Sequence, residues 1–367
     1  QLMKISVVQE NLVKAVATVS RVVGSRTSLP ILGNILLKAD KSSLSLSTTN
    51  LEIALTVTIG CKAEQTGVVC VPAKLLLETL QSLQSDKIML SGDENKLEIA
   101  AAGAEVQIQA MSAEEFPAIP AIDSPQNLIL KRDVIVDALT KVAVAASLDE
   151  SRPVLAGVYM KSSADELIFA ATDSYRLAEM RIPSSGGNEA TVILPLRTVQ
   201  EVLRLAGATE SAEITFELGK SEARVTIDNV ELVTRLIEGN FPNYTQIIPS
   251  QAATKLKTSR TELTQAARLA GIFARESAHT ITLKASGSTL QLHAEAAQVG
   301  ENTSEVSLKL EGADATISLN VRFLIDALGV MSTDEVELRL NDKLDPCVVV
   351  PVEKNNQYTH LIMPLRS

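Results

Sequence analysis

Tryptophan is absent from the 367-residue sequence, and aromatic residues make up only 3% of it. Apolar residues nevertheless account for 46%, so the cores must be built from Val, Ile, Leu and Ala. Only three cysteines occur, Cys61, Cys70 and Cys347, and none stands in a Cys-x-x-Cys pair. This pattern excludes a disulfide framework and a cysteine-based zinc site, and it is typical of a reducing cytoplasm.

Long apolar runs are also missing. No stretch reaches the roughly 18 apolar residues that a membrane-spanning helix needs, and the N-terminus lacks the charged start and apolar core of a signal peptide. We therefore expect a soluble, cytoplasmic protein with no membrane partner.

The residues of common catalytic and metal sites are scarce. The three histidines, His279, His293 and His360, stand alone, and there is no Gly-rich phosphate loop, Gly-x-Ser-x-Gly elbow or paired-histidine motif. Asp149 and Glu150 form the only acidic pair beside an arginine in a predicted loop. That pair fits a solvated turn better than a catalytic dyad. We predict no catalytic residue, metal or cofactor.

Acidic residues outnumber basic ones by 44 to 34, which gives a net charge of -10. A surface that binds nucleic acid broadly by neutralising phosphates is therefore not expected. Basic residues are nevertheless placed along the predicted helices and the loops that follow them, as at Lys14, Lys141, Arg204 and Arg268. Acidic residues on the same helices make a mixed, solvated face an equally open interpretation.

The sequence repeats one pattern three times. Amphipathic helices are predicted over residues 11–23, 133–146 and 261–273, each with a polar residue at its start that is suited to capping. Each is followed by alternating, β-rich sequence, by a short strand and by a second helix. Pro72, Pro195 and Val321 are expected just inside the starts of these second helices.

Each copy ends on a proline-containing segment, at Pro117, Pro242 and Pro364. Landmarks that recur about every 124 residues indicate three homologous domains, with boundaries predicted at 1–123, 124–250 and 251–367. Two helices and about eight antiparallel strands in each domain predict an α+β fold, with helices on the inner side of the sheets.

One segment, residues 171–180 with the sequence ATDSYRLAEM, places an aromatic, a guanidinium and an apolar side chain at a predicted strand turn. Thr, Asp and Ser are residues that favour turns, so an ordinary turn would explain this segment. The same arrangement could present Tyr175, Arg176 and Leu177 to a partner. The spacing alone leaves both interpretations open.

Five motifs together resemble the bacterial DNA polymerase III beta subunit family, the replicative sliding clamps, over essentially the whole chain. They are RTSLPILGNILL (26–37), ATDSYRLA (171–178), GNFPNYTQIIP (239–249), LNVRFLIDAL (319–328) and MPLRS (363–367). The resemblance implies a head-to-tail homodimer whose six domains close a ring around double-stranded DNA. Such a clamp has no reaction of its own. It tethers the polymerase to DNA and so confers processivity.

The resemblance also implies partners that dock a short linear motif between the second and third domains. These partners would be the DNA polymerase III alpha subunit, the clamp loader, other polymerases and repair proteins. Matched by position, the pocket residues are Leu155, Thr172, Ser174, Tyr175, Arg176, Leu177, Pro242, Ile247, Phe323, Leu344, Pro346, Ile362, Met363, Pro364, Leu365 and Arg366.

For DNA contact the resemblance implies Arg26 and Arg152, and the internal repeat adds Arg275. At the dimer seam it implies that two third-domain residues meet the first domain of a second copy. The seam residues are Ile272 and Phe273, against Lys74, Val106 and Ile108.

Two alternatives belong to other functional classes. One is an interaction scaffold of the same fold that no longer encircles DNA, and retention on circular DNA would separate it from a clamp. The other is a hydrolase that uses Asp149 and Glu150, which would lose its activity on Asp149→Ala.

Overall fold

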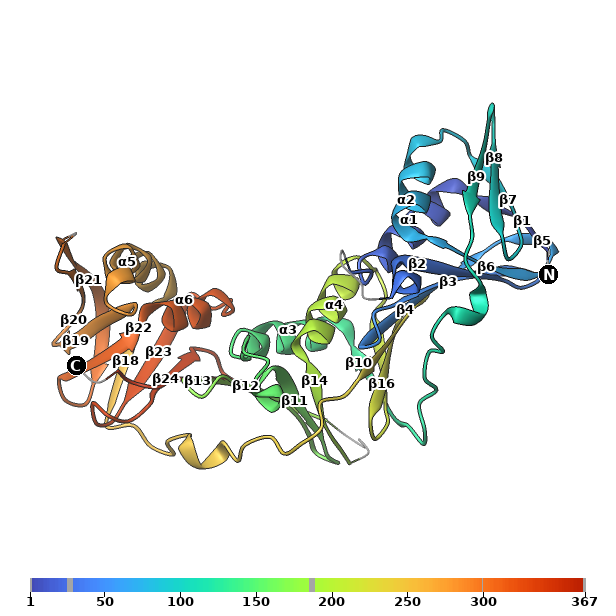
Figure 1. Ribbon diagram of the computed structural model, residues 1–367. Coiled ribbons are helices and arrows are strands. Elements are labelled where there is room, and N and C mark those ends of the chain that lie inside the picture. Colours follow the sequence, from blue (N-terminus) through green and yellow to red (C-terminus); the bar gives the residue numbers. More distant parts are fainter. Residues whose placement is uncertain (1, 25–28, 185–188, 299, 366–367) are drawn as a thin grey trace. The chain divides into compact units, whose positions relative to one another are not determined.

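The computed structural model describes residues 2–24, 29–184, 189–298 and 300–365 (Figure 1). Contacts divide the chain into two compact units. The first contains residues 1–132 and 204–236, and the second contains residues 133–203 and 237–367. The central third of the chain is thus shared between the units, because its strands pair edge to edge with strands of both terminal thirds.

The first unit holds two antiparallel sheets, with strand orders β5-β1-β7-β8-β9 and β10-β15-β16-β17-β4-β3-β2-β6. Its elements are β1 (Met3–Val8), α1 (Gln9–Ser20), β2 (Asn34–Ala39), β3 (Ser43–Thr49), β4 (Ile53–Gly60), β5 (Lys62–Gln65), β6 (Gly67–Pro72), α2 (Ala73–Ser82), β7 (Lys87–Gly92), β8 (Lys96–Ala101), β9 (Ala104–Gln109), β10 (Gln126–Lys131), β15 (Glu213–Leu218), β16 (Glu222–Ile227) and β17 (Val230–Arg235).

The second unit is built on one 12-stranded sheet, with the order β14-β11-β12-β13-β25-β24-β23-β18-β21-β20-β19-β22. Its elements are β11 (Gly157–Ser162), β12 (Glu166–Thr172), β13 (Arg176–Pro183), β14 (Ala190–Pro195), β18 (Thr254–Ser259), α5 (Arg260–Phe273), β19 (Thr280–Ser286), β20 (Thr289–Ala296), β21 (Gly300–Glu311), β22 (Ala315–Asn320), α6 (Val321–Gly329), β23 (Glu335–Leu340), β24 (Cys347–Pro351) and β25 (Tyr358–Ile362). Two helices cross the division between the units, α3 (Arg132–Ala143) and α4 (Leu196–Gly207).

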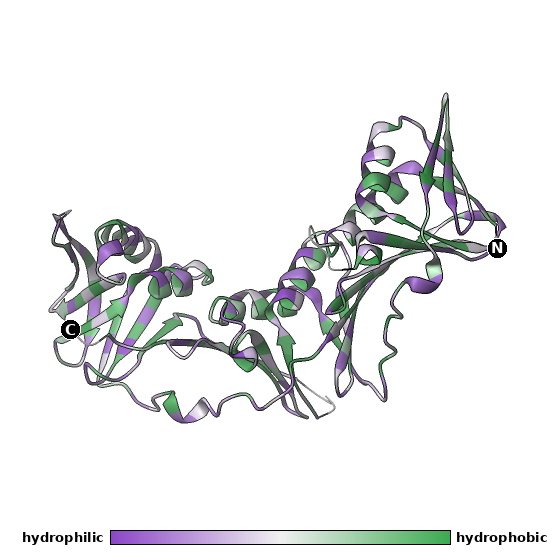
Figure 2. Ribbon diagram, in the orientation of Figure 1, coloured by the Kyte–Doolittle hydropathy of each residue, from purple (hydrophilic) through white to green (hydrophobic). Residues whose placement is uncertain are grey.

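The order of elements confirms the predicted repeat. Within the described residues, each third of the chain reads strand, helix, several strands, helix and three strands, with β5 as an extra strand in the first third. The cores are aliphatic as expected, because helices bury one stripe and strands bury alternate residues. In α1 the buried residues are Leu12, Ala15, Val16 and Val19, which is helical spacing. Figure 2 shows the matching interleaving of apolar and polar residues along the strands.

The helix ends differ from the prediction in two places. Pro72 and Pro195 are the last strand residues before α2 and α4, not their first helical residues. Val321 is the first residue of α6, as predicted, and Asn320 precedes it. The Asn320 side chain accepts a hydrogen bond from the backbone N–H of Arg322, so this helix is capped where the other two use proline. In α1 the capping residue is Val8, which offers no side-chain acceptor.

The two faces of the 12-stranded sheet are covered differently (Figure 1). Helices α5 and α6 pack on one face, and a connector, residues 237–253, crosses the other. Tyr244 of this connector is buried against Leu177, Val348 and Leu361 of the sheet, with Phe241 and Ile248 packed alongside. The connector therefore forms a wall above an apolar floor. No helix among the described residues is long and apolar enough to span a membrane.

Candidate peptide-binding site

A cavity of about 180 Å³ opens where the connector passes over the junction of β13 and β25. Its floor is sheet and its wall is connector, and all of it lies within the second unit. The lining residues are Leu155, Thr172, Ser174, Arg176, Leu177, Pro242, Asn243, Tyr244, Ile247, Leu361 and Met363. Eight of these eleven are among the residues predicted from the sequence.

The turn after β12 is fixed by its own side chains. Asp173 Oδ1 accepts hydrogen bonds from the backbone N–H groups of Tyr175, at 2.9 Å, and Arg176, at 3.0 Å. The Thr172 hydroxyl donates to the Arg176 carbonyl and accepts from the Ser174 N–H. Ser174 adopts a positive φ of 80°, which the tight turn requires. The predicted turn is therefore present, whereas the presentation of its side chains to a partner stays a prediction.

Arg176 is held on three sides. Its Nε donates to Asp173 Oδ2 at 3.0 Å, its Nη1 donates to Asp326 of α6, and its guanidinium lies 4.4 Å from the ring centroid of Phe323. This combination of two carboxylates and a cation–π contact fixes the guanidinium in one orientation. Phe323 therefore contributes to the site by supporting Arg176, and it does not line the cavity itself.

The connector is anchored by a buried carboxylate. Glu179 on β13 is 4% exposed, and its Oε2 accepts a hydrogen bond of 2.6 Å from the Tyr244 hydroxyl. The Arg181 guanidinium donates to both oxygens of Glu179, at 2.8 and 3.0 Å. Burial, followed by the hydrogen bond to Glu179, raises the pKa of the Tyr244 phenol, so it stays protonated as a donor. This network fixes the position of the connector over β13, and so the position of the cavity wall.

Residues 363–365, which follow β25, close the other side of the cavity. The backbone N–H of Met363 donates to the Tyr175 carbonyl at 2.8 Å, and that of Leu365 donates to the Ser318 carbonyl at 2.8 Å. Met363 lines the cavity, whereas Ile362 is fully buried beneath it. The Tyr175 side chain is 61% exposed and projects at the rim.

Other predicted pocket residues lie beyond the cavity lining. Leu344 is 60% exposed, and Pro346 and Pro364 are partly exposed. Arg366 lies outside the described residues. Three lining residues were missed from the sequence: Asn243, Tyr244 and Leu361. The first two fall inside the motif GNFPNYTQIIP, and Leu361 lies two residues before the first residue of MPLRS, so the motifs indicated the right segments without resolving which side chains face the cavity.

A second buried polar group lies in the floor strand β25. His360 is fully buried, and its Nδ1 is 2.8 Å from the Tyr358 hydroxyl, which donates to the Lys141 carbonyl at 3.0 Å. Its Nε2 has no hydrogen-bond partner among the described residues. Burial, with a smaller contribution from the charge of Arg176, lowers the pKa of His360 to about 3. The imidazole is therefore neutral in the folded protein at physiological pH.

The residues predicted for DNA contact are placed as follows. Arg152 donates to the Ser174 hydroxyl at 3.0 Å and to the Asp173 carbonyl, which puts it at the rim of the cavity. Arg275 is exposed just after α5. Arg26 lies outside the described residues.

The predicted seam residues differ in exposure. Ile272 on α5 is 52% exposed, Lys74 on α2 is exposed, and Val106 and Phe273 are partly exposed. Ile108 is only 2% exposed, so it packs mainly in the core of its own chain.

The acidic pair does not form a catalytic arrangement. Asp149 Oδ1 accepts from the backbone N–H of Ser151, and hydrogen bonds from Ser151 lower the pKa of this carboxyl, the opposite of what a general acid needs. Glu150 pairs with Arg197 at 3.1 Å on the surface. Among the described residues, no group of three or more His, Cys, Asp or Glu side chains could hold a metal ion.

His360 makes folding stability depend on pH. Because its folded pKa is about 3, below the ordinary 6.5, its contribution is complete above the unfolded value and is lost as the pH falls toward the folded one. Between about pH 7.5 and 5.5 we expect this group to remove about 1.4 kcal/mol from the free energy of unfolding. Urea unfolding of wild type and His360→Asn at both pH values measures the difference. His293→Asn is the matched control, and an unchanged pH dependence in His360→Asn would contradict the assignment.

Comparisons with known proteins agree over the whole chain. Models of the N-terminal, central and C-terminal domains of the DNA polymerase III beta subunit match residues 3–120, 129–243 and 245–366. The beta sliding clamp of Synechocystis is 28% identical and that of Pseudomonas putida 27% identical, each over 99% of this chain and 99% or more of its own. The solved structure of the Pseudomonas aeruginosa subunit superposes over 100% of both chains with a TM-score of 0.95 at 26% identity, and that of Thermotoga maritima over 100% of both with 0.91 at 25%. The chain belongs to the DNA polymerase III beta subunit family, the bacterial sliding clamps.

Proposed function

We propose that this protein is a DNA sliding clamp, a ring-shaped homodimer that encircles duplex DNA and holds the replicative polymerase on it. The observation that carries the proposal is the threefold repeat, because each copy in turn is matched by a clamp-domain model. The domain boundaries of 1–123, 124–250 and 251–367 belong to this proposal. So does a location in the cytoplasm, where the chromosome is replicated. The clamp is a non-catalytic processivity factor, so its work is binding.

Two open sheet edges support a head-to-tail seam. In the described part of the chain, β9 forms an edge of the five-stranded sheet, and residues 300–307 of β21 pair with β20 on one side only. Unpaired strand edges favour addition of another strand. Ile272 and Leu269 on α5 are 52% and 46% exposed, and Leu75 on α2 is 47% exposed. A second copy would cover these edges and apolar side chains, and a heterologous contact made twice closes a ring.

For DNA we propose Arg26, Arg152 and Arg275 as contacts inside the ring. A net charge of -10 is compatible with this role, because a closed ring is retained by topology rather than by tight phosphate binding. Arg152 also donates to Ser174 at the cavity rim, so a phosphate that engages Arg152 would compete with that hydrogen bond.

The cavity is proposed to bind a short apolar motif of partner proteins. An apolar floor, a fixed guanidinium and a rim with a few polar groups are what short-peptide capture requires. Partners would be the DNA polymerase III alpha subunit, the clamp loader, and other polymerases and repair proteins. All of them would use one site on each chain, so they would compete.

Combined loss of Arg176 and of residues 363–367 should abolish binding of the alpha subunit. Arg176→Ala removes the guanidinium on one side, and the truncation removes Met363 on the other. Loss of one such central contact typically costs about 2 kcal/mol or more, a decrease of roughly 30-fold in affinity, so loss of both should take binding below detection. Surface plasmon resonance with purified alpha subunit measures the affinity, and sizing shows whether the dimer survives. Unchanged affinity in an intact dimer would refute the pocket assignment.

Charged residues at Ile272 and Phe273 should give monomers. Glutamate at both positions would bury unpaired charge in an apolar seam, which is strongly unfavourable. Analytical ultracentrifugation reports the oligomeric state. Leu344→Glu is the matched control, because Leu344 is an exposed apolar residue outside the proposed seam. A double variant that remains dimeric at micromolar concentration would place the seam elsewhere.

A further inference from the structure

Two arginines of the second unit have no carboxylate partner. Arg275 lies in the turn that follows α5, Arg322 is the second residue of α6, and both side chains are exposed. Among the described residues, neither guanidinium forms an ion pair or a hydrogen bond with another side chain or with the backbone. The protein therefore supplies no counter-charge to either arginine, although its acidic residues outnumber its basic ones by 44 to 34.

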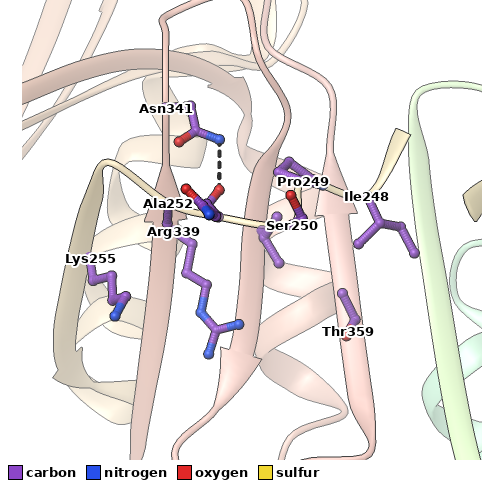
Figure 3. Close-up of a pocket in the computed structure, with 10 residues that line it drawn as sticks. Ile248, Pro249, Ser250, Ala252, Lys255, Arg339, Asn341 and Thr359 are labelled. Carbon is purple, nitrogen blue, oxygen red and sulfur yellow. Dashed lines mark hydrogen bonds between the residues drawn. The ribbon is translucent and has the colours of Figure 1, made fainter. Parts of the chain in front are cut away.

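Other cations of the same unit are neutralised. Arg339 and Lys255 extend along the sheet beside the connector, where they line a cavity of about 500 Å³ (Figure 3). Glu337 accepts a hydrogen bond from the Arg339 Nε at 2.6 Å, and Glu311 accepts one from the Lys255 Nζ at 3.3 Å. A cation beside a cavity is thus not by itself available to a ligand in this unit.

The internal repeat shows what changes around Arg322. In the second copy of the repeat, Arg197 is likewise the second residue of its helix, α4, and it pairs with Glu150 of the loop after α3 at 3.1 Å. In the third copy, the turn after α5 provides Arg275 instead. The acidic residue of this turn, Glu276, is exposed and forms no ion pair with a described residue. A neutralised contact in one copy is therefore replaced by two unpaired cations in the next.

His279 lies between the two arginines. Its backbone N–H donates to the Ala274 carbonyl at 2.8 Å, and its carbonyl accepts from the Val321 N–H at 2.8 Å. Arg275 directly follows Ala274, and Arg322 directly follows Val321. Each arginine is thus one residue away from a backbone group that is bonded to His279. Burial, followed by the charges of Arg322 and Arg275, lowers the pKa of His279, so the imidazole is neutral at physiological pH and offers one N–H donor.

The backbone of this turn is held in an unfavourable conformation. Ala278 and His279 have positive φ angles of 53° and 60°, in the left-handed region that residues other than glycine seldom adopt. Such strain persists where the surrounding contacts impose it, and it is frequent at ligand sites. Here the two backbone hydrogen bonds of His279 impose it. The turn is therefore fixed before a ligand binds, which limits the entropy that binding costs.

We propose that Arg275, His279 and Arg322, which we call the phosphate cluster, together bind one phosphate group of the DNA backbone. The planar guanidinium presents paired N–H donors that match phosphate oxygens. The charge of Arg322 is disfavoured by Arg275 and by its place in the first turn of a helix, and a bound anion would relieve both effects. This inference rests on the proposed DNA-encircling function. It adds two residues to Arg275 and makes the three a single site.

The salt dependence of DNA binding tests the phosphate cluster. Affinity for a short fluorescein-labelled duplex is measured by fluorescence anisotropy at increasing KCl, and each neutralised phosphate contributes about 0.9 to the slope of log affinity against log salt. Arg275→Gln with Arg322→Gln should reduce this slope by about 0.9, because both arginines share one phosphate. It should also weaken binding about tenfold at low salt. Thermal unfolding checks that the double variant is folded.

Two further variants complete the design. Lys284→Gln with Lys309→Gln is the matched control, because these exposed lysines of β19 and β21 have no ion pair with a described residue and carry the same total charge. It should leave the slope unchanged. His279→Asn keeps a residue that tolerates the left-handed conformation and removes the imidazole. It should weaken binding about threefold, as loss of one neutral donor predicts, with the slope unchanged.

Each contrary result has its own meaning. An unchanged slope in the arginine double variant would overturn the phosphate cluster, and a decrease of about 1.8 would show two separate phosphate contacts instead of one site. Unchanged affinity of His279→Asn would contradict the role of the imidazole. Unchanged DNA binding with weaker binding of the clamp loader would assign the cluster to an acidic protein surface. Tight binding of inorganic phosphate in isothermal titration would assign it to a free phosphate compound.

Retention of wild type on nicked circular DNA separates this inference from the proposed function. If wild type is retained on circles but its affinity for the duplex does not depend on salt, no phosphate is bound, and the phosphate cluster is wrong while the clamp stands. If wild type is not retained on circles, the proposed function is wrong, and the inference built on it falls too.

Discussion

The antiparallel pairing of β13 with β25 is the contact on which the second unit depends. It joins strands from the central and the last parts of the sequence into one 12-stranded sheet, and it sets Leu177 directly opposite Leu361. That pairing supplies the apolar floor over which the connector passes, and it brings the end of the chain beside the Arg176 turn. A one-residue slip would reverse the faces of both side chains and remove the floor. The pocket is thus a product of strand register.

Apolar burial alone would hold the connector down without fixing its position. Glu179 supplies the missing specificity, because a buried carboxylate must be paired, and Tyr244 and Arg181 provide that pairing. The connector can therefore settle in one place only.

Much of the fold and part of the site were predictable because they are encoded in short stretches of the sequence. The repeat, the helices and the turn at residues 171–176 follow from periodicity and turn chemistry, and the structure contains them within a few residues. The fused sheets were not predictable, since pairing between distant strands has no local signature. Likewise Tyr244 was missed because its role depends on Glu179, which a strand pattern only marks as polar. Phe323 was predicted as lining but supports Arg176, and Ile108 packs largely within its own core, because side-chain direction is decided by tertiary packing.

A clamp stays on DNA by topology, and that claim is tested most directly by cutting the circle. Labelled protein is loaded by its clamp loader onto nicked circular DNA, free protein is removed, and the bound fraction is followed before and after a restriction enzyme linearises the circle. A closed ring predicts that protein remains on circles and runs off the new ends within the time of the cut. Equal dissociation from circular and linear DNA would contradict the account and leave a protein that binds peptides without encircling DNA.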